Sequence, residues 1–347
     1  MQSATTREPS ARLGEGCRVL TDMEIRQDSL WSARTSLLNE IETPSLGALG
    51  RWLDKKRQAP NSLLQALKLL AHQGDYDAVV TSTLRTGQIF GFARTLFRIR
   101  RPVHVHLELW LDDERDSFWW KAKRFFQRLA FASTDLMITS ASGEIEVYSE
   151  RFNLPPDRFR FVPFHTNVVR PGAVGREGGY AFSAGKSGRD YPLLAEAAKD
   201  IDVELVVLGN ERSLRGVVFP EQAEVLVDQP YDRYLELLHG CDFVVVPLAD
   251  SEISRGHVVI LEAMALGKPV IATKTLATVD YIESGDNGIL VPPGDPPSLA
   301  AAIRQLSGDP ELRAHLSKRG LERMQRHTFR NYVETILAHV EDTVSSA

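Results

Sequence analysis

The sequence has few cysteines, little net charge and no long apolar run. Its 347 residues include only Cys17 and Cys241, which excludes a disulfide framework, and Cys241 is predicted to be a buried free thiol. No segment approaches the roughly 18 uncharged apolar residues of a membrane span, and residues 1–16 lack the apolar core of a signal peptide. We therefore expect a cytoplasmic protein in which residues 1–16 are disordered. A net charge of −5 argues against a general nucleic-acid binder, which would be basic.

What the sequence does contain is a regular alternation of apolar strands and amphipathic helices. Its 43% hydrophobic and 25% charged residues are ordinary for a globular protein, and its length suffices for two domains. Strands are predicted over residues 18–20, 77–81, 102–109, 136–139, 159–163, 180–184, 203–208, 225–227, 243–247, 270–273 and 288–291. Helices are predicted over residues 62–72, 87–98, 117–132, 258–266 and 331–344. This order indicates an α/β protein with parallel, doubly wound sheets.

A cluster of glycines and prolines over residues 170–179 divides the chain. It predicts a first Rossmann-like domain over residues 17–169, a hinge over 170–179 and a second domain over 180–328. Residues 24–60 are polar and show no clear pattern, so they do not reveal what the first domain binds.

The segment from Ser254 to Thr273 is the most informative part of the chain. It reads as a polar loop, a helix that Gly267 ends, and a buried strand. The free N–H groups at the start of such a helix can bind an anion, and Glu262 lies close enough to accept hydrogen bonds from a ribose. Periodicity alone favours an ordinary helix-to-strand connection.

The identities of the residues are more informative than their periodicity. Residues 262–272, Glu-Ala-Met-Ala-Leu-Gly-Lys-Pro-Val-Ile-Ala, closely resemble the signature of the retaining glycosyltransferases of family 4, and residues 280–295 extend the match. The resemblance implies the GT-B fold, in which two Rossmann-like domains face each other across a cleft and a last helix, here 329–347, crosses back to the first domain. It also implies a nucleotide-sugar donor as co-substrate, no resident cofactor, no metal, and a carbohydrate or lipid-linked acceptor.

A second motif follows the strand predicted at 180–184. Gly185 permits a close backbone approach, and Lys186 and Arg189 place two cations at the carboxyl end of that strand, where open α/β sheets bind ligands. The family pattern sets such a basic pair against the donor diphosphate. A solvated turn with two surface cations is the alternative.

Ser254 departs from the family pattern, which carries a sugar-associated glutamate eight positions before the residue that matches Glu262. The donor-binding residues indicated by the resemblance are therefore Gly185, Ser254, Gly256, His257, Val258 and Glu262. Some relatives present a histidine to the sugar from a strand of the first domain, which makes His106 a third catalytic candidate beside Lys186 and Arg189. A hydrogen-bonded core histidine is the competing interpretation of His106.

The helix predicted over 117–132 has two stripes. At 100° per residue Phe118, Ala122, Phe125, Phe126 and Leu129 form an apolar stripe that we expect in the core. The basic stripe Lys121, Arg124 and Arg128, with Trp120 at its margin, is typical of a surface that meets an anionic membrane, here the inner face. A solvated basic helix face is the alternative.

The sequence therefore predicts a GT-B glycosyltransferase that transfers a sugar from a nucleotide-sugar donor with retention. The acidic run 112–116 is read as a solvated loop, so no metal is expected. Two rival functions stay open: a non-hydrolysing nucleotide-sugar epimerase of the same fold, and a catalytically inactive partner subunit.

Overall fold

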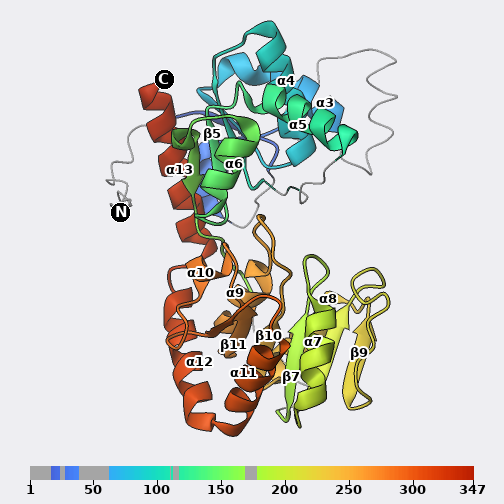
Figure 1. Cartoon of the computed structure of the whole chain (residues 1–347). Coiled ribbons are helices and arrows are strands. Elements are labelled where there is room, and N and C mark those ends of the chain that lie inside the picture. The colour runs from blue at the N-terminus through green and yellow to red at the C-terminus, as the bar shows by residue number, and fades with distance from the viewer. Residues whose placement is uncertain (1–16, 24–27, 39–61, 110, 112–116, 169–177) are drawn as a thin grey trace, which may run out of the picture. The chain divides into compact units, whose positions relative to one another are not determined.

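The chain forms two compact units in a computed structural model, which describes residues 17–23, 28–38, 62–109, 111, 117–168 and 178–347 (Figure 1). Unit 1 comprises residues 1–139, 145–162 and 332–347, and unit 2 comprises 140–144 and 163–331. Residues 1–16, most of the stretch 24–60, the acidic run 112–116 and hinge residues 170–177 lie outside the described residues.

Unit 1 is built on a sheet of parallel strands in the order β2-β1-β3-β4-β5-β6. The strands are β1 (Val19–Thr21), β2 (Thr35–Leu37), β3 (Ala78–Thr81), β4 (Val103–Leu107), β5 (Leu136–Thr139) and β6 (Phe159–Phe161). The helices are α1 (Ser29–Arg34), α3 (Ser62–His72), η1 (Gln73–Asp75), α4 (Leu84–Phe97), α5 (Phe118–Phe131), η2 (Pro156–Arg158), and most of α6 (Glu144–Phe152) and α13 (Phe329–Ser346). Leu20 and Val79 of the sheet pack on Leu69 of α3 and Phe90 of α4.

Unit 2 has a second parallel sheet, in the order β12-β11-β10-β7-β8-β9. The strands are β7 (Tyr180–Ala184), β8 (Glu204–Gly209), β9 (Ala223–Val227), β10 (Phe243–Val246), β11 (Val270–Thr273) and β12 (Ile289–Val291). The helices are α7 (Tyr191–Ala197), η3 (Ala198–Asp200), α8 (Tyr231–Gly240), α9 (His257–Ala265), α10 (Thr278–Tyr281), α11 (Pro296–Gly308) and α12 (Pro310–Met324). The prediction of two doubly wound Rossmann-like sheets is confirmed.

Helices cover both faces of the sheet in unit 2, as a doubly wound sheet requires. Val244 and Val246 of β10 face a core that includes Leu261 of α9, whereas Phe243 and Val245 face a core that includes Ile303 of α11. The strands are buried on both faces and therefore read as continuous apolar runs rather than as alternating ones. Cys241 is buried in the first of these cores as a free thiol, as predicted, and burial raises its pKa to about 12.

Short polar motifs set where the helices begin. Asp295 and Asp309 each accept a hydrogen bond from the backbone N–H three residues later, and each is followed by a proline at the first helical position. The aspartate accepts from a backbone N–H that has no partner within the helix, and the proline fixes φ at the start of the first turn. Ser117 caps α5 in the same way through the N–H of Trp120.

The expected burial of the apolar stripe of α5 is wrong. Phe118, Phe125 and Phe126 are 77%, 60% and 59% exposed, and the helix instead buries Gln127, Ala130 and Phe131. The reason is a close approach to α4, since a Cβ at Gly91 would overlap the carbonyl oxygen of Ala130. Only the carboxyl-terminal part of α5 docks in this way, which leaves Phe118, Trp119, Phe125 and Phe126 in solvent.

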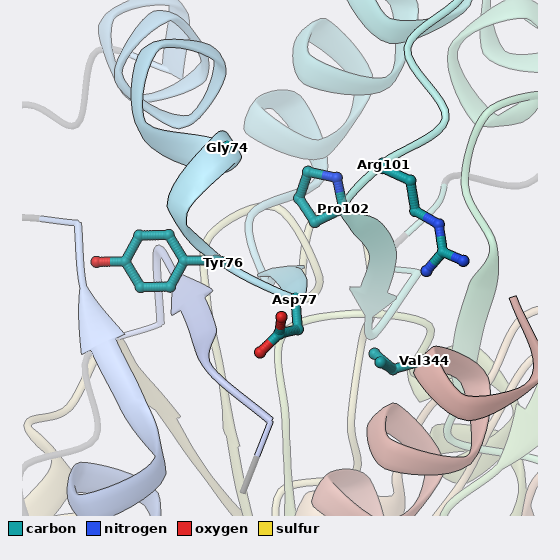
Figure 2. Close-up of a pocket in the computed structure, with 6 residues that line it drawn as sticks. All are labelled: Gly74, Tyr76, Asp77, Arg101, Pro102 and Val344. Atoms are coloured by element: carbon teal, nitrogen blue, oxygen red, sulfur yellow. The ribbon is translucent and has the colours of Figure 1, made fainter.

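A pocket of about 290 Å³ lies in unit 1 (Figure 2). Its lining residues are Gly74, Tyr76, Asp77, Arg101, Pro102 and Val344. Asp77 directly precedes β3 and Pro102 directly precedes β4, so the pocket lies at the amino ends of these strands. Ligands of open α/β sheets bind at the carboxyl ends, and this pocket is therefore not the candidate site.

Candidate functional site

The strand order of unit 2 reverses between β7 and β10, which are neighbours in the sheet. Loops leaving such a switch point diverge and form the usual ligand site of a doubly wound sheet. The loop 185–190 follows β7, and the loop 247–256 follows β10. Asp190 N–H donates to the Pro247 carbonyl at 3.1 Å and Ala249 N–H donates to the Gly188 carbonyl at 3.1 Å, so the two loops are fastened together.

Gly185 and Arg189 are in close contact within the first loop. Arg189 Nε donates to the carbonyl oxygen of Ala184 at 2.8 Å, and a Cβ at Gly185 would overlap the Arg189 guanidinium. Gly185 also has φ +141°, a conformation that other residues rarely adopt. Burial lowers the pKa of Arg189, while the nearby Tyr191 and Tyr234 act in the opposite direction. The glycine therefore lets the backbone hold a cation at the end of β7.

Lys186 and Arg255 supply two more cations to the same place. The Lys186 side chain is exposed, and its ammonium has no hydrogen bond or ion pair within the part of the chain that the structure describes. The stem of Arg255 packs on Gly188, where a Cβ would overlap Arg255 Cδ. Arg255 follows a serine in a polar loop, and nothing in its sequence context distinguished it as a partner of Gly188.

The amino end of α9 faces these loops without a side-chain cap. Gly256 is the N-cap residue with φ +86°, and no side chain accepts from the first N–H groups. Val258 is 37% exposed, whereas His257 is buried. Uncapped N–H groups at a helix start attract anions, so this end of α9 and the nearby cations are a candidate site for a phosphate group.

Ser254 and His257 are buried together beside a carboxylate. Ser254 Oγ lies 3.1 Å from His257 Nδ1, and Ser254 N–H donates to Glu144 Oε1 at 2.9 Å. Glu144 belongs to unit 2, and its Oε2 also accepts from Ala141 N–H. Glu144 was missed by sequence reasoning because it stands 110 residues away from Ser254.

Glu262 is held by two tyrosines that sequence reasoning also missed. Tyr231 Oη donates to Glu262 Oε1 at 2.9 Å, and Tyr234 Oη donates to Oε2 at 2.5 Å. Both tyrosines lie on α8, and their i, i+3 spacing puts them on one face of that helix. The spacing was visible in the sequence, but nothing linked α8 to the glutamate.

His106 lies in the core of unit 1. Its side chain is fully buried, and Nδ1 is 2.8 Å from Thr81 Oγ1, which is also 2.9 Å from His104 Nε2. Burial lowers the pKa of His106 to about 4. This enclosure does not fit the sugar contact suggested for His106 and favours the core-histidine interpretation.

Acidification should destabilise the protein through its buried histidines. Burial lowers the pKa of His257 and of His106 from the usual 6.5 of a histidine to about 4, so the folded state holds them neutral. Their contribution to the free energy of unfolding is present above pH 6.5 and is lost as the pH falls towards 4, because over this range the unfolded chain binds protons that the folded chain does not bind. Urea unfolding midpoints should fall steadily over this range, and less steeply in a His257→Gln variant. A midpoint that does not change with pH would contradict the expectation.

Among the described residues, no group of three or more His, Cys, Asp and Glu side chains could hold a metal ion. None of the described helices is long and apolar enough to span a bilayer.

Residues 189–309 match the family model for group 1 glycosyl transferases, and residues 8–165 match that for the glycosyl transferase 4-like domain. The chain belongs to the family 4 glycosyltransferases. The resemblance of residues 262–272 and 280–295 to this family is thereby confirmed.

Curated relatives of this family 4 chain include enzymes with phosphorylated or lipid acceptors in their names. The D-inositol 3-phosphate glycosyltransferase of Acidothermus cellulolyticus is 26% identical over 62% of this chain and 54% of its own length. The phosphatidyl-myo-inositol mannosyltransferase of Mycolicibacterium smegmatis is 32% identical over 45% of this chain and 40% of its own length. The alignments thus span about half, or less, of these relatives.

Solved structures share the fold of this family 4 protein at low identity. Anabaena HepE, solved in complex with UDP, has a TM-score of 0.65 at 16% identity and covers 95% of this chain and 100% of its own. Sucrose-phosphate synthase of Thermosynechococcus elongatus has a TM-score of 0.63 at 17% identity, covering 83% of this chain and 80% of its own. The GT-B fold predicted from the sequence is therefore the fold of these neighbours.

Proposed function

We propose that the chain transfers a sugar from a nucleotide-sugar donor to an acceptor, with retention at the anomeric carbon. The observation that carries the proposal is the meeting of three features at the β7–β10 switch point: the cationic loop 185–189, the uncapped start of α9, and the carboxylate of Glu262. A nucleoside diphosphate needs these features, which are cations and N–H groups for its phosphates and a carboxylate for its ribose.

Each residue has a role in this proposal. Glu262 binds the ribose, and Lys186 and Arg189 stabilise the negative charge that develops on the departing nucleoside diphosphate. The N–H groups from Gly256 to Val258 bind a phosphate. Ser254 and His257 lie behind these amides, where their mutual contact and the bond to Glu144 hold the loop in place. HepE has been solved with UDP and with UDP and glucose, which supports a uridine nucleotide as one donor to test.

A nucleotide panel tests the donor site. Thermal unfolding is measured with UDP, GDP, ADP and their glucose and mannose conjugates. A specific ligand at about 100 times its Kd should stabilise the fold by about 2.7 kcal/mol. No stabilisation by any nucleotide would overturn the donor assignment.

Products distinguish the rival functions. Transfer to an added acceptor, with an anomeric configuration that matches the donor, supports a retaining transferase. Epimerisation of the free nucleotide sugar would favour the epimerase, and nucleotide binding without turnover would favour an inactive partner subunit.

Activity should survive removal of divalent metal ions. The cations of the loop 185–189 and the start of α9 can neutralise the diphosphate, which is the task that a metal performs in other transferases. Turnover measured with excess EDTA should equal turnover without it. Loss of activity in EDTA, followed by rescue with magnesium or manganese, would be the opposite result.

We further propose that unit 1 binds the acceptor at the inner face of a membrane. α4 packs against both α3 and α5 (Figure 1). These three helices expose a set of large apolar side chains that we term the aromatic face. The aromatic face consists of Leu63, Leu67, Phe92, Leu96, Phe97, Phe118, Trp119, Phe125 and Phe126. Lys121, Lys123 and Arg124 are interleaved with it on α5, and Lys123 Nζ lies 4.2 Å from the centre of the Trp120 ring. Aromatic residues with nearby cations favour the interface of an anionic bilayer and suit a lipid-linked acceptor.

Vesicle co-sedimentation tests the aromatic face. The predicted basic stripe included Arg128, but Arg128 Nε donates to the Arg151 carbonyl at 2.9 Å, so its replacement would also disturb α6. The sharper variant reverses Lys121, Lys123 and Arg124 to Glu. It should lose binding to anionic vesicles at low salt, because each cation contributes roughly 1 kcal/mol near such a surface.

The control variant reverses the exposed cations Arg212, Arg215 and Lys318 of unit 2 to Glu and should bind vesicles as the wild type does. Wild-type protein that stays in the supernatant with anionic vesicles would overturn the membrane assignment and favour a soluble acceptor.

A further inference from the structure

The two oxygens of the Glu262 carboxylate each accept one hydrogen bond from a tyrosine of α8. A carboxylate offers about four lone-pair positions, so each oxygen keeps one for another donor. The vicinal 2′ and 3′ hydroxyls of a ribose are two such donors at the spacing of one carboxylate. The tyrosines therefore fix the plane of the carboxylate and leave its remaining positions for the ribose.

The two tyrosines differ in how much of each residue is exposed to solvent. Tyr234 is 9% exposed and packs on Phe182 of β7, while Tyr231 is 56% exposed. Their ring centroids are 5.6 Å apart with the planes inclined by 30°. Tyr231 thus presents a broad aromatic surface to solvent directly beside the carboxylate, whereas Tyr234 is enclosed.

Both hydroxyls remain protonated at neutral pH. Burial, and then the neighbouring Glu262, raise the pKa of Tyr234 far above its usual value, and the same causes raise the pKa of Tyr231. Each tyrosine is therefore a permanent donor to Glu262, and such charge-assisted bonds are stronger than neutral ones.

We propose that Tyr231 and Tyr234 complete nucleoside recognition: Tyr234 positions Glu262 for the ribose hydroxyls, and the exposed ring of Tyr231 is the surface on which the nucleobase stacks. This rests on the donor site proposed above. Because every base has a π-face, stacking on Tyr231 contributes affinity for all nucleotides and selects little among them.

The stacking role is tested by calorimetric titration with UDP, GDP and ADP, and with ribose 5-phosphate as a base-free probe. Tyr231→Ala should bind each nucleoside diphosphate that the wild type binds about tenfold more weakly, a loss of the size expected for one aromatic–base stack. Its affinity for ribose 5-phosphate should fall much less, and by no more than in Tyr231→Phe, because both variants lose the hydroxyl that donates to Glu262. Tyr231→Phe keeps the ring and should retain most of the nucleotide affinity.

The positioning role of Tyr234 is tested by the preference for ribose over 2′-deoxyribose, not by nucleotide affinity alone. The wild type should prefer a ribonucleoside diphosphate over its 2′-deoxy analogue, and Tyr234→Phe should reduce that preference several-fold because Glu262 loses a fixed orientation. The matched control is Tyr180→Phe, which removes another buried hydroxyl that donates to α8, at the carbonyl of Leu237, but does not contact Glu262. The control should keep the wild-type preference.

The stacking role of Tyr231 and the positioning role of Tyr234 each have a result that would overturn them. Equal nucleotide affinity in folded Tyr231→Ala, or an equal loss for ribose 5-phosphate, would exclude stacking on this ring. An unchanged ribose preference in Tyr234→Phe would exclude the positioning role. Tyr231→Leu, which keeps an apolar side chain without a π-face, replaces Tyr231→Ala if the latter does not fold. If the wild type binds none of the three nucleotides, the donor site itself fails and this assignment falls with it.

Discussion

Replacing Glu262 with glutamine should lower kcat/KM by about 100-fold while the protein stays folded. Glutamine keeps the shape of the side chain but removes the charge, so the bonds to a ribose diol become neutral ones. The loss of charge-assisted bonds of this kind amounts to about 2.7 kcal/mol, which corresponds to about 100-fold. The measurement is the initial rate of sugar transfer over a range of donor concentrations, with circular dichroism as the check of the fold.

A matched control for this change lies close by. Glu252 is exposed in the loop that precedes α9 and has the same chemistry as Glu262. Glu252→Gln should turn over at the wild-type rate. A folded Glu262→Gln variant with wild-type donor affinity and kcat would remove Glu262 from the donor site.

Lys186→Ala should lower kcat/KM by about 100- to 1,000-fold, by analogy with the removal of one preorganised donor to a developing negative charge. The unfolding temperature should not change, because the Lys186 side chain is exposed and its ammonium makes no ion pair within the described residues. Arg189→Ala should lower kcat/KM less but should also destabilise the fold, because it removes the bond to the Ala184 carbonyl. Single-turnover kinetics with saturating donor separate the effect on chemistry from that on binding.

The exposed Lys199 of the same unit provides the control. Lys199→Ala removes a positive charge near β8 and should leave turnover unchanged. Wild-type turnover in both Lys186→Ala and Arg189→Ala would mean that the diphosphate binds elsewhere.

The sequence predicted the buried strands better than the orientation of the helices, for a physical reason. Strands that are buried on both faces, such as β7 and β11, are apolar throughout and stand out, and their bounds were predicted to the residue. Amphipathic helices are harder to orient. The apolar stripe of α5 has the period of a core helix, but Gly91 determines which part of α5 docks, and this close approach depends on α4 rather than on α5 itself.

The same limit applies to the candidate site. Gly185, Lys186, Arg189 and Glu262 lie in short motifs that sequence reasoning can find. Tyr231, Tyr234 and Glu144 act through contacts with residues 28 to 110 positions away, and their local sequence carries no sign of those contacts.

The hydrogen bonds between the loops 185–190 and 247–256 limit how far the length of the first loop can change. The bonds from Asp190 to Pro247 and from Ala249 to Gly188 fix the number of residues between the end of β7 and the start of α7. One inserted residue between Gly185 and Gly188 would shift Arg189 out of reach of the Ala184 carbonyl, although the inserted residue itself would lie in solvent. Substitutions at the exposed Ser187 carry no such penalty. Natural variants should therefore differ freely in the identity of residue 187 and keep the length of this loop constant.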